Sequence, residues 1–387
     1  MQIALFDNKH RNKFFPLTET RAISDFKTGI FTNKERWEYF SGTEVLILTE
    51  KYLQELYNKN ISGDILLIDA SVIFTEQQAK KILQIPTDYC ISFAKDFIAG
   101  RISTKENFDI ESLNNLSFNK MVDWKEDLLR LDYPWQLFQN NDVFIRNDYK
   151  LITDGRTSNK LDKSNTIINL ENIFIEDSVD VKHSCLNAST GPIYIGKNVT
   201  IMEGCFLRGP LVIGDNSLIK IGAKIYGATT IGSNCVVNGE IKNSVIFNNS
   251  NKAHDGYLGD SVIGSWCNLG AGTSNSNLKN NASEIHIWNQ STKNNIPVGQ
   301  KCGVIMGDYT KTAINSSINT GSIFGVCCNV FGNGLLPKYL SNFSWGLTEK
   351  YQIQKAIEDV DQWKKLKNQQ IIATEKNILE HLANNNK

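Results

Sequence analysis

The chain has 387 residues, of which 41% are hydrophobic, and its 41 basic and 41 acidic residues give a formal net charge of zero. This length predicts two or three domains, and a neutral chain without a basic field argues against nucleic acid as a partner. The N-terminus has no basic region before an apolar run, and no segment approaches the roughly 20 apolar residues of a membrane span. We therefore expect a cytoplasmic protein, outside the membrane, whose eight scattered cysteines are buried free thiols.

Residues 1–162 are predicted to form an α/β domain. Apolar runs at Val45–Leu48 and 65–68 are typical of buried strands, and helical segments are expected at 50–58 and 75–83. Strands that alternate with helices in this way favour a sheet with crossover helices. The polar segment 150–164 is the expected linker to the rest of the chain.

A strict six-residue period follows between Ile195 and Val237. An apolar residue occupies every sixth position, and glycine follows three of these residues at a spacing of 18. A period of six fits neither an α-helix nor an ordinary strand, and it is the signature of hexapeptide repeats. Three hexads would close one coil of a left-handed parallel β-helix, with the glycines at turns that need a positive φ. The apolar set is Ile195, Ile201, Leu207, Ile213, Ile219, Ile225, Ile231 and Val237.

The predicted β-helix domain spans residues 163–346, with its first coil near Asn169 and an irregular register after Val237. Residues 280–301 interrupt the repeat with a strand-like run at 285–288 and a turn at 293–295. We expect a hairpin or loop there, at an edge of the β-helix where binding surfaces between subunits are common. The expected later register positions are Val245, Tyr257, Ile263, Leu269, Met306, Ile318, Phe324 and Val330.

The segment 347–387 is predicted to be helical. Apolar residues recur at spacings of three and four from Ile353 to Trp363, and Thr348 is the expected N-cap. A single amphipathic helix must bury its apolar stripe, so we expect it to pack on the β-helix or on another subunit.

The residues that could carry chemistry gather where the strict hexads end. His254 lies in Lys252-Ala253-His254-Asp255-Gly256-Tyr257, and a neutral histidine is a suitable general base near pH 7. An amine nucleophile needs such a base, because an ammonium has no lone pair with which to attack an acyl group. The alternative is that His254 is a turn residue on a solvated edge.

This run, together with Asn268-Leu269-Gly270-Ala271-Gly272, resembles the acetyltransferase half of a bacterial bifunctional family, the N-acetylglucosamine-1-phosphate uridyltransferase/glucosamine-1-phosphate acetyltransferases. The family has His-x-x-Tyr-[Leu/Ile]-Gly-Asp and then Asn-[Ile/Leu]-Gly-Ala-Gly, and the chain has both at a matching separation. The whole chain looks closest to a shorter bacterial variant of this enzyme. Other matching segments are Pro16-Leu17-Thr18, Tyr133-Pro134-Trp135, Ile305-Met306-Gly307-Asp308 and Phe343-Ser344-Trp345-Gly346.

The resemblance implies roles for residues of the β-helix. His254 would be the base that deprotonates the sugar amine, and Tyr257 and Asn268 would contact the amino sugar phosphate. Lys242 would bind the phosphate. Lys224 stands where the family has an arginine, which weakens bidentate phosphate recognition.

Two further positions follow from the same resemblance. Ala271 would approach the pantetheine of acetyl-CoA through its backbone. Lys279 is a candidate for an outer substrate contact; it lies in Asn277-Leu278-Lys279-Asn280, where the chain departs from the family's run Asn-Tyr-Asp-Gly.

The family's nucleotidyltransferase half has a glycine-rich loop whose backbone cradles a triphosphate. This chain instead has Leu5-Phe6-Asp7-Asn8-Lys9-His10-Arg11, without glycine. Candidate Mg²⁺ ligands are Asp69, at the end of an apolar run, and Asn147, which resembles the family's second metal contact; either could also be structural. Candidate contacts to the phosphates of UTP, or else solvated surface charges, are Arg11, Arg21 and Lys27.

Four functional hypotheses remain open at this point. The first is a bifunctional transferase that makes UDP-N-acetylglucosamine, a cell-wall precursor, from acetyl-CoA, glucosamine-1-phosphate and UTP. The second is an acyltransferase whose N-terminal domain has lost nucleotide chemistry, and the third is a sugar-1-phosphate nucleotidyltransferase, for example a thymidylyl transferase, whose β-helix only mediates oligomerisation. The fourth is a non-catalytic scaffold that binds sugar nucleotide. Hexapeptide β-helices usually trimerise, and in the resembling family the acyl-transfer site lies between the prism-shaped β-helices of adjacent subunits. We therefore expect a homotrimer.

Overall fold

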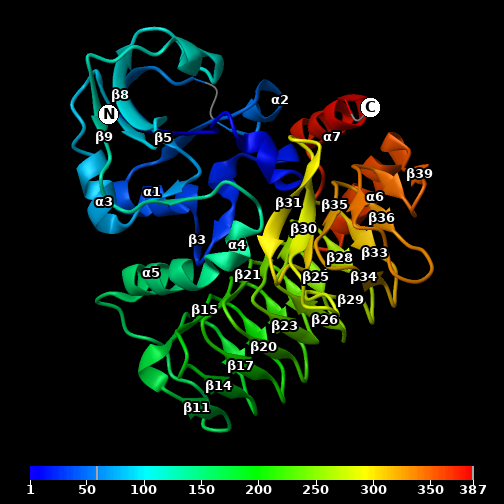
Figure 1. Cartoon of the computed structure of the whole chain (residues 1–387). Helices are drawn as coiled ribbons and strands as arrows, with labels where there is room; N and C mark the ends of the chain where they lie inside the picture. The colour runs from blue at the N-terminus through cyan, green and yellow to red at the C-terminus, as the bar shows by residue number, and fades with distance from the viewer. Residues whose placement is uncertain (58–59, 386–387) are drawn as a thin grey trace.

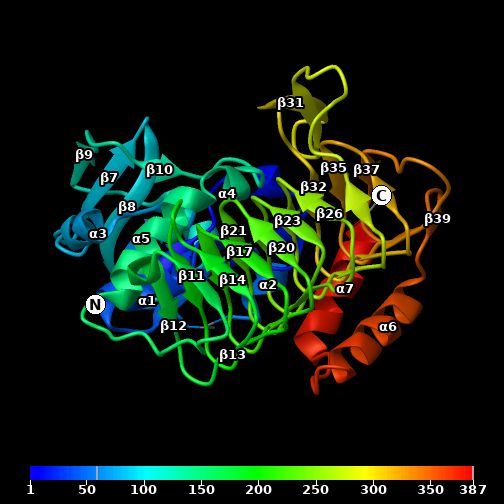
Figure 2. The same ribbon diagram turned by 90° about the horizontal axis from the view of Figure 1, so that it is seen from below.

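The computed structural model describes residues 1–57 and 60–385. The N-terminal α/β domain lies along one side of a long β-helix, and two C-terminal helices pack near its far end (Figure 1). The view from below shows the coils of the β-helix stacked side by side (Figure 2). No helix in the described part of the chain is long and apolar enough to cross a membrane.

The N-terminal domain is built on a six-stranded sheet in the order β4-β1-β5-β8-β7-β9. Strand β1 pairs in parallel with β4 and β5, and β8 then adds antiparallel to β5. Both predicted strands are confirmed. The strands are β1 (Gln2–Phe6), β4 (Val45–Leu48), β5 (Gly63–Asp69), β7 (Tyr89–Phe93), β8 (Asp96–Thr104) and β9 (Lys120–Asp123), with the short pairs β2 (Lys27–Thr28) and β3 (Phe31–Thr32), and β6 (Val72–Ile73) and β10 (Leu129–Arg130).

Short helices connect and cover these strands. Helix α3 confirms the predicted segment 75–83, and its N-cap Thr75 forms a capping box with Gln78. Helix α2 is shorter than the predicted 50–58, and residue 58 lies outside the described residues. Helix α5 extends into the predicted linker, which has no regular structure from 154 onward. The helices are α1 (Asn33–Ser41), α2 (Lys51–Gln54), α3 (Glu76–Ile82), α4 (Gln136–Gln139) and α5 (Asn141–Thr153), and the 3-10 helices are η1 (Arg11–Phe14), η2 (Leu17–Glu19), η3 (Ile23–Asp25), η4 (Glu111–Asn115) and η5 (Leu170–Asn172).

Parallel strands of the repeat region form the three faces of a β-helix, which confirms the predicted fold. The open face contains β11 (Thr166–Ile168), β14 (Cys185–Asn187), β17 (Phe206–Arg208), β20 (Lys224–Tyr226), β23 (Glu240–Lys242) and β26 (Tyr257–Gly259). The domain face contains β12 (Ile173–Ile175), β15 (Ile193–Ile195), β18 (Leu211–Ile213), β21 (Thr229–Ile231), β24 (Val245–Ile246), β27 (Val262–Ile263), β32 (Val304–Met306), β35 (Ser322–Phe324) and β37 (Tyr339–Leu340). The helix face contains β13 (Asp180–Val181), β16 (Thr200–Ile201), β19 (Leu218–Ile219), β22 (Val236–Val237), β25 (Asn251–Lys252), β28 (Asn268–Leu269), β33 (Lys311–Thr312), β36 (Asn329–Val330), β38 (Ser344–Trp345) and β39 (Glu349–Lys350). Strands β29 (Ser274–Asn275) and β34 (Ser317–Ile318), which come later in the chain than β26, pair in parallel with each other as a separate two-stranded sheet.

All eight apolar residues of the strict six-residue period are buried in one stacked core, as predicted. The glycines that follow them are required for another reason than the one expected, because Gly196, Gly214 and Gly232 are absent from the residues with positive φ. A Cβ at Gly214 would lie 2.7 Å from the backbone carbon of Gly232 on the next coil. Glycine is therefore needed there for the close approach of neighbouring coils.

After Val237 the predicted register is off by one at two positions. Ile246 and Leu258 point into the core, whereas Val245 packs against the N-terminal domain and Tyr257 is half-buried on the open face. The corner between β22 and β23 has two residues, whereas the corner between β19 and β20 has four, so the six-residue spacing of inward-facing side chains changes after Val237. The remaining later positions, from Ile263 to Val330, are buried as predicted.

The N-terminal domain covers the domain face. Phe247 packs its ring against that of Phe26 with 6.3 Å between centroids, in a core that Leu17 and Ile305 share. The predicted hairpin is confirmed as β30 (Ile285–Asn289) and β31 (Asn294–Gly299). Its apolar side chains pack on this same core, so the hairpin contacts both the N-terminal domain and the β-helix.

Two C-terminal helices, α6 (Ile353–Lys365) and α7 (Ala373–Asn385), replace the single helix that we predicted. Thr348 does not cap α6, because β39 pairs antiparallel with β38 before the helix begins. The predicted stripe of α6 packs with α7 and Trp266 against the β-helix, together with Leu53 of the N-terminal domain. All eight cysteines are free, and only Cys185 is not fully buried.

Candidate functional sites

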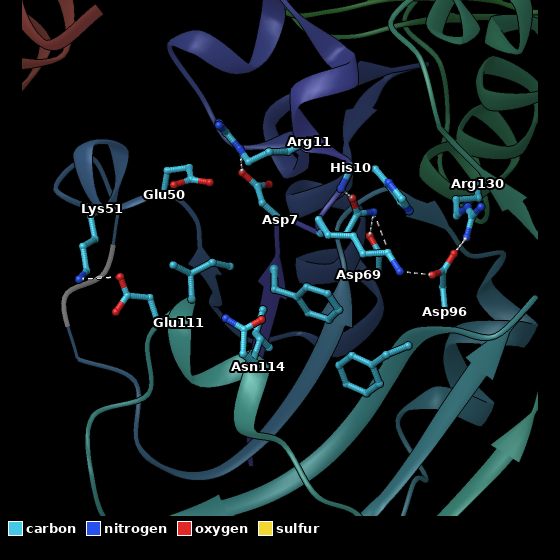
Figure 3. A pocket seen from close by; sticks show the side chains of 16 residues that line it. Asp7, His10, Arg11, Glu50, Lys51, Asp69, Asp96, Glu111, Asn114 and Arg130 are labelled. Carbon is cyan, nitrogen blue, oxygen red and sulfur yellow. Dashed lines mark hydrogen bonds and ion pairs between the residues drawn. The ribbon is translucent and has the colours of Figure 1, made fainter. Parts of the chain in front are cut away.

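A cavity of about 420 Å³ opens at the carboxyl ends of β1 and β5 in the N-terminal domain. The strand order reverses here, because β4 and β5 lie on opposite sides of β1. Open α/β sheets bind their ligands at such an edge. The turn after β1 supplies Asp7, Asn8 and Arg11 to the cavity, and β5 supplies Asp69 (Figure 3).

Asp69 is the last residue of β5 and is only 2% exposed. Its carboxylate accepts hydrogen bonds from the Asn8 amide at 2.9 and 3.0 Å, and from the hydroxyl and backbone N–H of Ser71 at 2.8 Å each. Burial raises the pKa of Asp69 to about 6, although these hydrogen bonds favour the charged form. At pH 7 Asp69 is therefore a carboxylate at the wall of a cavity.

Basic side chains around this cavity are already paired with acidic ones (Figure 3). Arg11, which is buried, also donates to the backbone oxygen of Thr18 at 2.6 Å. An anionic ligand would therefore have to displace the acidic partners of these basic side chains, or bind together with a cation. The pairs are Arg11–Asp7 at 3.0 Å, Lys9–Asp96 at 2.9 Å, Arg130–Asp96 at 2.8 Å and Lys51–Glu111 at 2.7 Å.

Arg21 and Lys27 do not line this cavity, which corrects their assignment as phosphate contacts. The Arg21 guanidinium forms an ion pair with Asp308 of the β-helix and lies 4.8 Å from the ring centroid of Phe247. It therefore joins the domain to the β-helix. The ammonium of Lys27 donates to Glu35 at 3.3 Å and lines a separate cavity against the domain face.

Asn147 is also displaced from the predicted metal site. It is exposed on α5 and lines a different cavity, of about 810 Å³, next to the buried ion pair between Asp148 and Arg36 (2.9 Å). Asp69 is thus the predicted metal ligand that lines the first cavity. Within residues 1–57 and 60–385, no group of three or more His, Cys, Asp or Glu residues is arranged to hold a metal ion.

The open face of the β-helix aligns residues that are far apart in the sequence. Lys224, Glu240 and Tyr257 are register partners on three successive coils, and Lys242 lies two residues beyond Glu240 on the same strand. Side chains at alternate positions of a strand point to the same side, so these four residues share the outer surface. Lys224 is exposed, while the other three are partly exposed.

A small polar network fixes the position of Tyr257. Its hydroxyl accepts a hydrogen bond from the Asn277 amide at 3.0 Å, and Asn277 also donates to Asp260. Burial and the charge of Asp260 raise the pKa of Tyr257 to about 12, so the phenol is neutral at pH 7. Asn277 was not among the predicted site residues, although it begins the motif in which we selected Lys279. Lys279 itself is partly exposed and donates to its own loop, at the backbone oxygen of Glu284.

His254 lies in the corner of residues 253–256, between β25 on the helix face and β26 on the open face. Its side chain is exposed, and no described residue forms a hydrogen bond with the imidazole. The equivalent corner of the next coil contains Ala271, and the N–H of Gly272 donates to the oxygen of Asp255 at 3.1 Å. His254 and Ala271 are therefore neighbours along one edge of the prism.

Asn268 is the exception among the predicted residues of this site. It lies on the helix face, where its side-chain oxygen accepts a hydrogen bond from Asn251 at 3.4 Å. Asn251 in turn accepts from Lys367, which follows helix α6. The structure therefore brings together His254, Ala271 and Tyr257, with Lys224 and Lys242 on the adjacent open face, and leaves Asn268 on another face.

Comparisons with known proteins agree with this two-part organisation. Residues 3–157 match the family model described as "Sugar nucleotidyl transferase". The bifunctional protein GlmU of Methanococcus vannielii is 27% identical over 382 residues, which cover 81% of this chain and 84% of the relative. The bifunctional protein GlmU of Methanocaldococcus jannaschii is 31% identical over 101 residues, covering 26% of this chain and 24% of the relative.

A solved structure, a hexapeptide transferase family protein from Anaplasma phagocytophilum, also matches, with a TM-score of 0.24 and 13% identity over 53% of this chain and 88% of that chain. A likeness this low adds no argument about function. The fold and the sequence relatives define the class of protein as a transferase with a sugar nucleotidyl transferase domain and a hexapeptide β-helix. More particularly, the chain is GlmU-like over most of its length, which confirms the resemblance inferred from its sequence motifs.

Proposed function

We propose that the chain synthesises UDP-N-acetylglucosamine in two steps. The β-helix transfers an acetyl group from acetyl-CoA to the amine of glucosamine-1-phosphate, and the N-terminal domain transfers a uridylyl group from UTP to the product. One observation carries the proposal: His254 lies at the edge of a face on which Lys224, Lys242 and Tyr257 are stacked. A base, two cations and a neutral phenol suit an amino sugar phosphate.

In the acetyl transfer, the imidazole of His254 accepts a proton from the substrate amine as its nitrogen attacks the thioester carbonyl. A C–N bond forms, the C–S bond breaks, and the proton that His254 took from the amine passes to the departing thiolate. Lys242 and Lys224 would bind the sugar phosphate, and the neutral hydroxyl of Tyr257 can donate to a sugar oxygen. The backbone at Ala271, one coil from His254, would adjoin the acyl donor.

In the nucleotidyl transfer, Asp69 and Arg11 are the residues of the first cavity to which we assign roles. One or two carboxylates together with substrate phosphates are a usual ligand set for Mg²⁺, so Asp69 fits one ligand position. Bound there, the ion would neutralise charge on the triphosphate and orient the in-line attack. Arg11, once released from Asp7, would contribute a planar donor set to a phosphate group.

We further propose a homotrimer in the cytoplasm, with the acetyl-transfer site completed between adjacent β-helices. The N-terminal domain covers one face of the prism and the C-terminal helices cover much of another, whereas the open face carries Phe206 with 62% of its surface exposed. Ile221 and Ile314, 61% and 68% exposed, lie at the same edge as His254. Exposed apolar side chains gathered along one surface favour contact with another protein surface.

The first test is acetyl-CoA-dependent thiol release with glucosamine-1-phosphate. We expect turnover in the wild type and a fall of at least ~10²-fold for His254→Ala, because a positioned base contributes about that much. His183→Ala is a matched control, since His183 is exposed at the same edge of an earlier coil. Equal rates in wild type and His254→Ala would contradict the proposal.

One observation favours a second candidate, an acyltransferase without nucleotide chemistry. The N-terminal cavity has no glycine-rich loop and its basic side chains are occupied by ion pairs. Pyrophosphate release from UTP and N-acetylglucosamine-1-phosphate, measured with Mg²⁺, decides between the two candidates. No release, beside active acetyl transfer, would establish the second candidate.

A further inference from the structure

A lysine occupies a core position of the β-helix directly below His254. Along the helix face, Ile219 pairs with Val237 and Val237 with Lys252, so Lys252 takes the inward slot that aliphatic residues fill on neighbouring coils. Leu269 fills the slot of the next coil. Lys252 is only 1% exposed, although burying an ammonium in an apolar core is costly. A residue this unfavourable for packing requires a specific explanation.

The contacts of the buried ammonium supply that explanation. The Nζ of Lys252 donates to the backbone oxygen of His254 and, at 3.5 Å, to that of Asn238. The corner at Asn238 has two residues between its strands, whereas the His254 corner above it has four. Because the two corners differ in length, the backbone carbonyl groups of Asn238 and His254 both lie within reach of the buried ammonium. Lys252 donates a hydrogen bond to each of them.

The backbone of this corner, rather than a side-chain contact, determines where His254 points, and hydrogen bonds from Gly272 N–H to the Asp255 oxygen and from Glu240 N–H to the Gly256 oxygen hold its second half. Gly256 has a φ of +126°, and a Cβ there would lie 2.1 Å from the oxygen of Thr273, so only glycine fits that position. Since no described residue bonds to the imidazole of His254, its placement depends on the backbone of residues 253–256. Lys252 holds that backbone from inside the prism.

We propose that Lys252 is a positioning residue for acetyl transfer: its buried ammonium fixes the corner that carries His254. The proposal rests on the acetyltransferase function proposed above. Burial lowers the pKa of Lys252 to about 8, with Asp255 as the charged group that opposes this shift, so the ammonium form still predominates at pH 7. The cation thus remains available to both carbonyl groups.

The test compares Lys252→Met, Lys252→Gln and the control Leu269→Met in the full-length protein. Methionine has nearly the shape of lysine and suits an aliphatic slot, so we expect Lys252→Met to remain folded, with a Tm lowered by the loss of a donor to both carbonyl groups. We nevertheless expect its kcat for acetyl transfer to fall about 10-fold or more with KM changed less than about 3-fold, because a misplaced base slows the reaction without weakening binding. Glutamine, which retains a donor, should recover part of the loss, and Leu269→Met should behave like the wild type.

A second measurement separates this proposal from the proposed function. Hydrogen exchange of the amides at 253–256 reports the order of the corner whether or not the enzyme is active. We expect faster exchange in Lys252→Met than in the wild type, with exchange in the adjoining strands unchanged. Unchanged exchange together with wild-type kcat would overturn the positioning role. If the wild type is inactive with glucosamine-1-phosphate, the proposed function is overturned. If Lys252→Met nevertheless exchanges faster than the wild type at 253–256, the role of Lys252 in holding the corner is kept.

Discussion

The cavity of the N-terminal domain holds its lysine and arginine side chains in ion pairs, whereas His254 and the lysines of the open face are exposed or partly exposed. Asp69 and Arg11 are buried and their partners lie within 3.0 Å. By contrast, His254 has no described partner for its imidazole, and Lys224 is exposed. The residues assigned to the first site all come from the N-terminal domain, while those of the second lie on a surface that another copy of the chain would cover in the proposed trimer.

This difference follows from how each site is built. In the β-helix, backbone register stacks one coil on the next, so it brings side chains of successive coils onto one surface. In the α/β domain, loops converge from separate strands, and ion pairs hold the converging side chains. The two sites should therefore respond differently to mutation: the first to loss of individual charges, the second to loss of assembly. Each prediction below tests one side of this contrast.

The largest effect is expected from Asp69→Asn on uridylyl transfer. Removing the carboxylate would remove a candidate metal ligand, and we expect a loss of about 10³-fold, since a metal ion contributes several kcal/mol to a transition state. Pyrophosphate release should fall while thiol release from acetyl-CoA stays within a factor of about two. Asp123→Asn, an exposed carboxylate on β9, is the control. Equal loss of both activities would show that the two sites are not independent.

The next effect concerns assembly. Phe206→Asp would place a charge on the open face, and burying unpaired charges at an interface is unfavourable. We expect light scattering to give a monomer mass, and acetyl transfer to fall about 10²-fold while uridylyl transfer persists. Leu366→Asp, at a side chain 74% exposed near the end of α6, is the matched control and should leave the assembly unchanged. A wild type that is itself monomeric with ligands present would contradict the interface.

A smaller effect is expected from Lys242→Ala. The loss of one charge-assisted contact to a phosphate should raise KM for glucosamine-1-phosphate about 10-fold. The kcat should change less than about 3-fold, because the contact is the same in substrate and transition state. Lys197→Ala, an exposed lysine at another edge of the prism, should not alter KM. Steady-state kinetics at fixed acetyl-CoA measures both constants.

The sequence predicted the β-helix core well, because one short repeat determines both the slot and the direction of each side chain. Every member from Ile195 to Val237 is buried where expected. Prediction failed where distant segments meet: Arg21 and Asp308 are 287 residues apart, and no local pattern links them. The same limit applies to Asn147, whose helix faces another cavity. The role of Lys252 was missed because it depends on unequal corners in adjacent coils.

An effect no larger than that of Lys242→Ala is expected from the pH dependence of Mg²⁺ binding at the N-terminal site. Burial raises the pKa of Asp69 to about 6, so the carboxylate is lost as the pH falls through that value. At pH 5 only about a tenth of molecules would carry the charge that binds Mg²⁺, and the apparent Mg²⁺ affinity should fall about 10-fold from its value at pH 7. Titrating pyrophosphate release with Mg²⁺ at several pH values measures this shift. Saturating Mg²⁺ should restore the rate at pH 5, because metal and proton compete for one carboxylate, and a rate that stays low would assign the titration to another group.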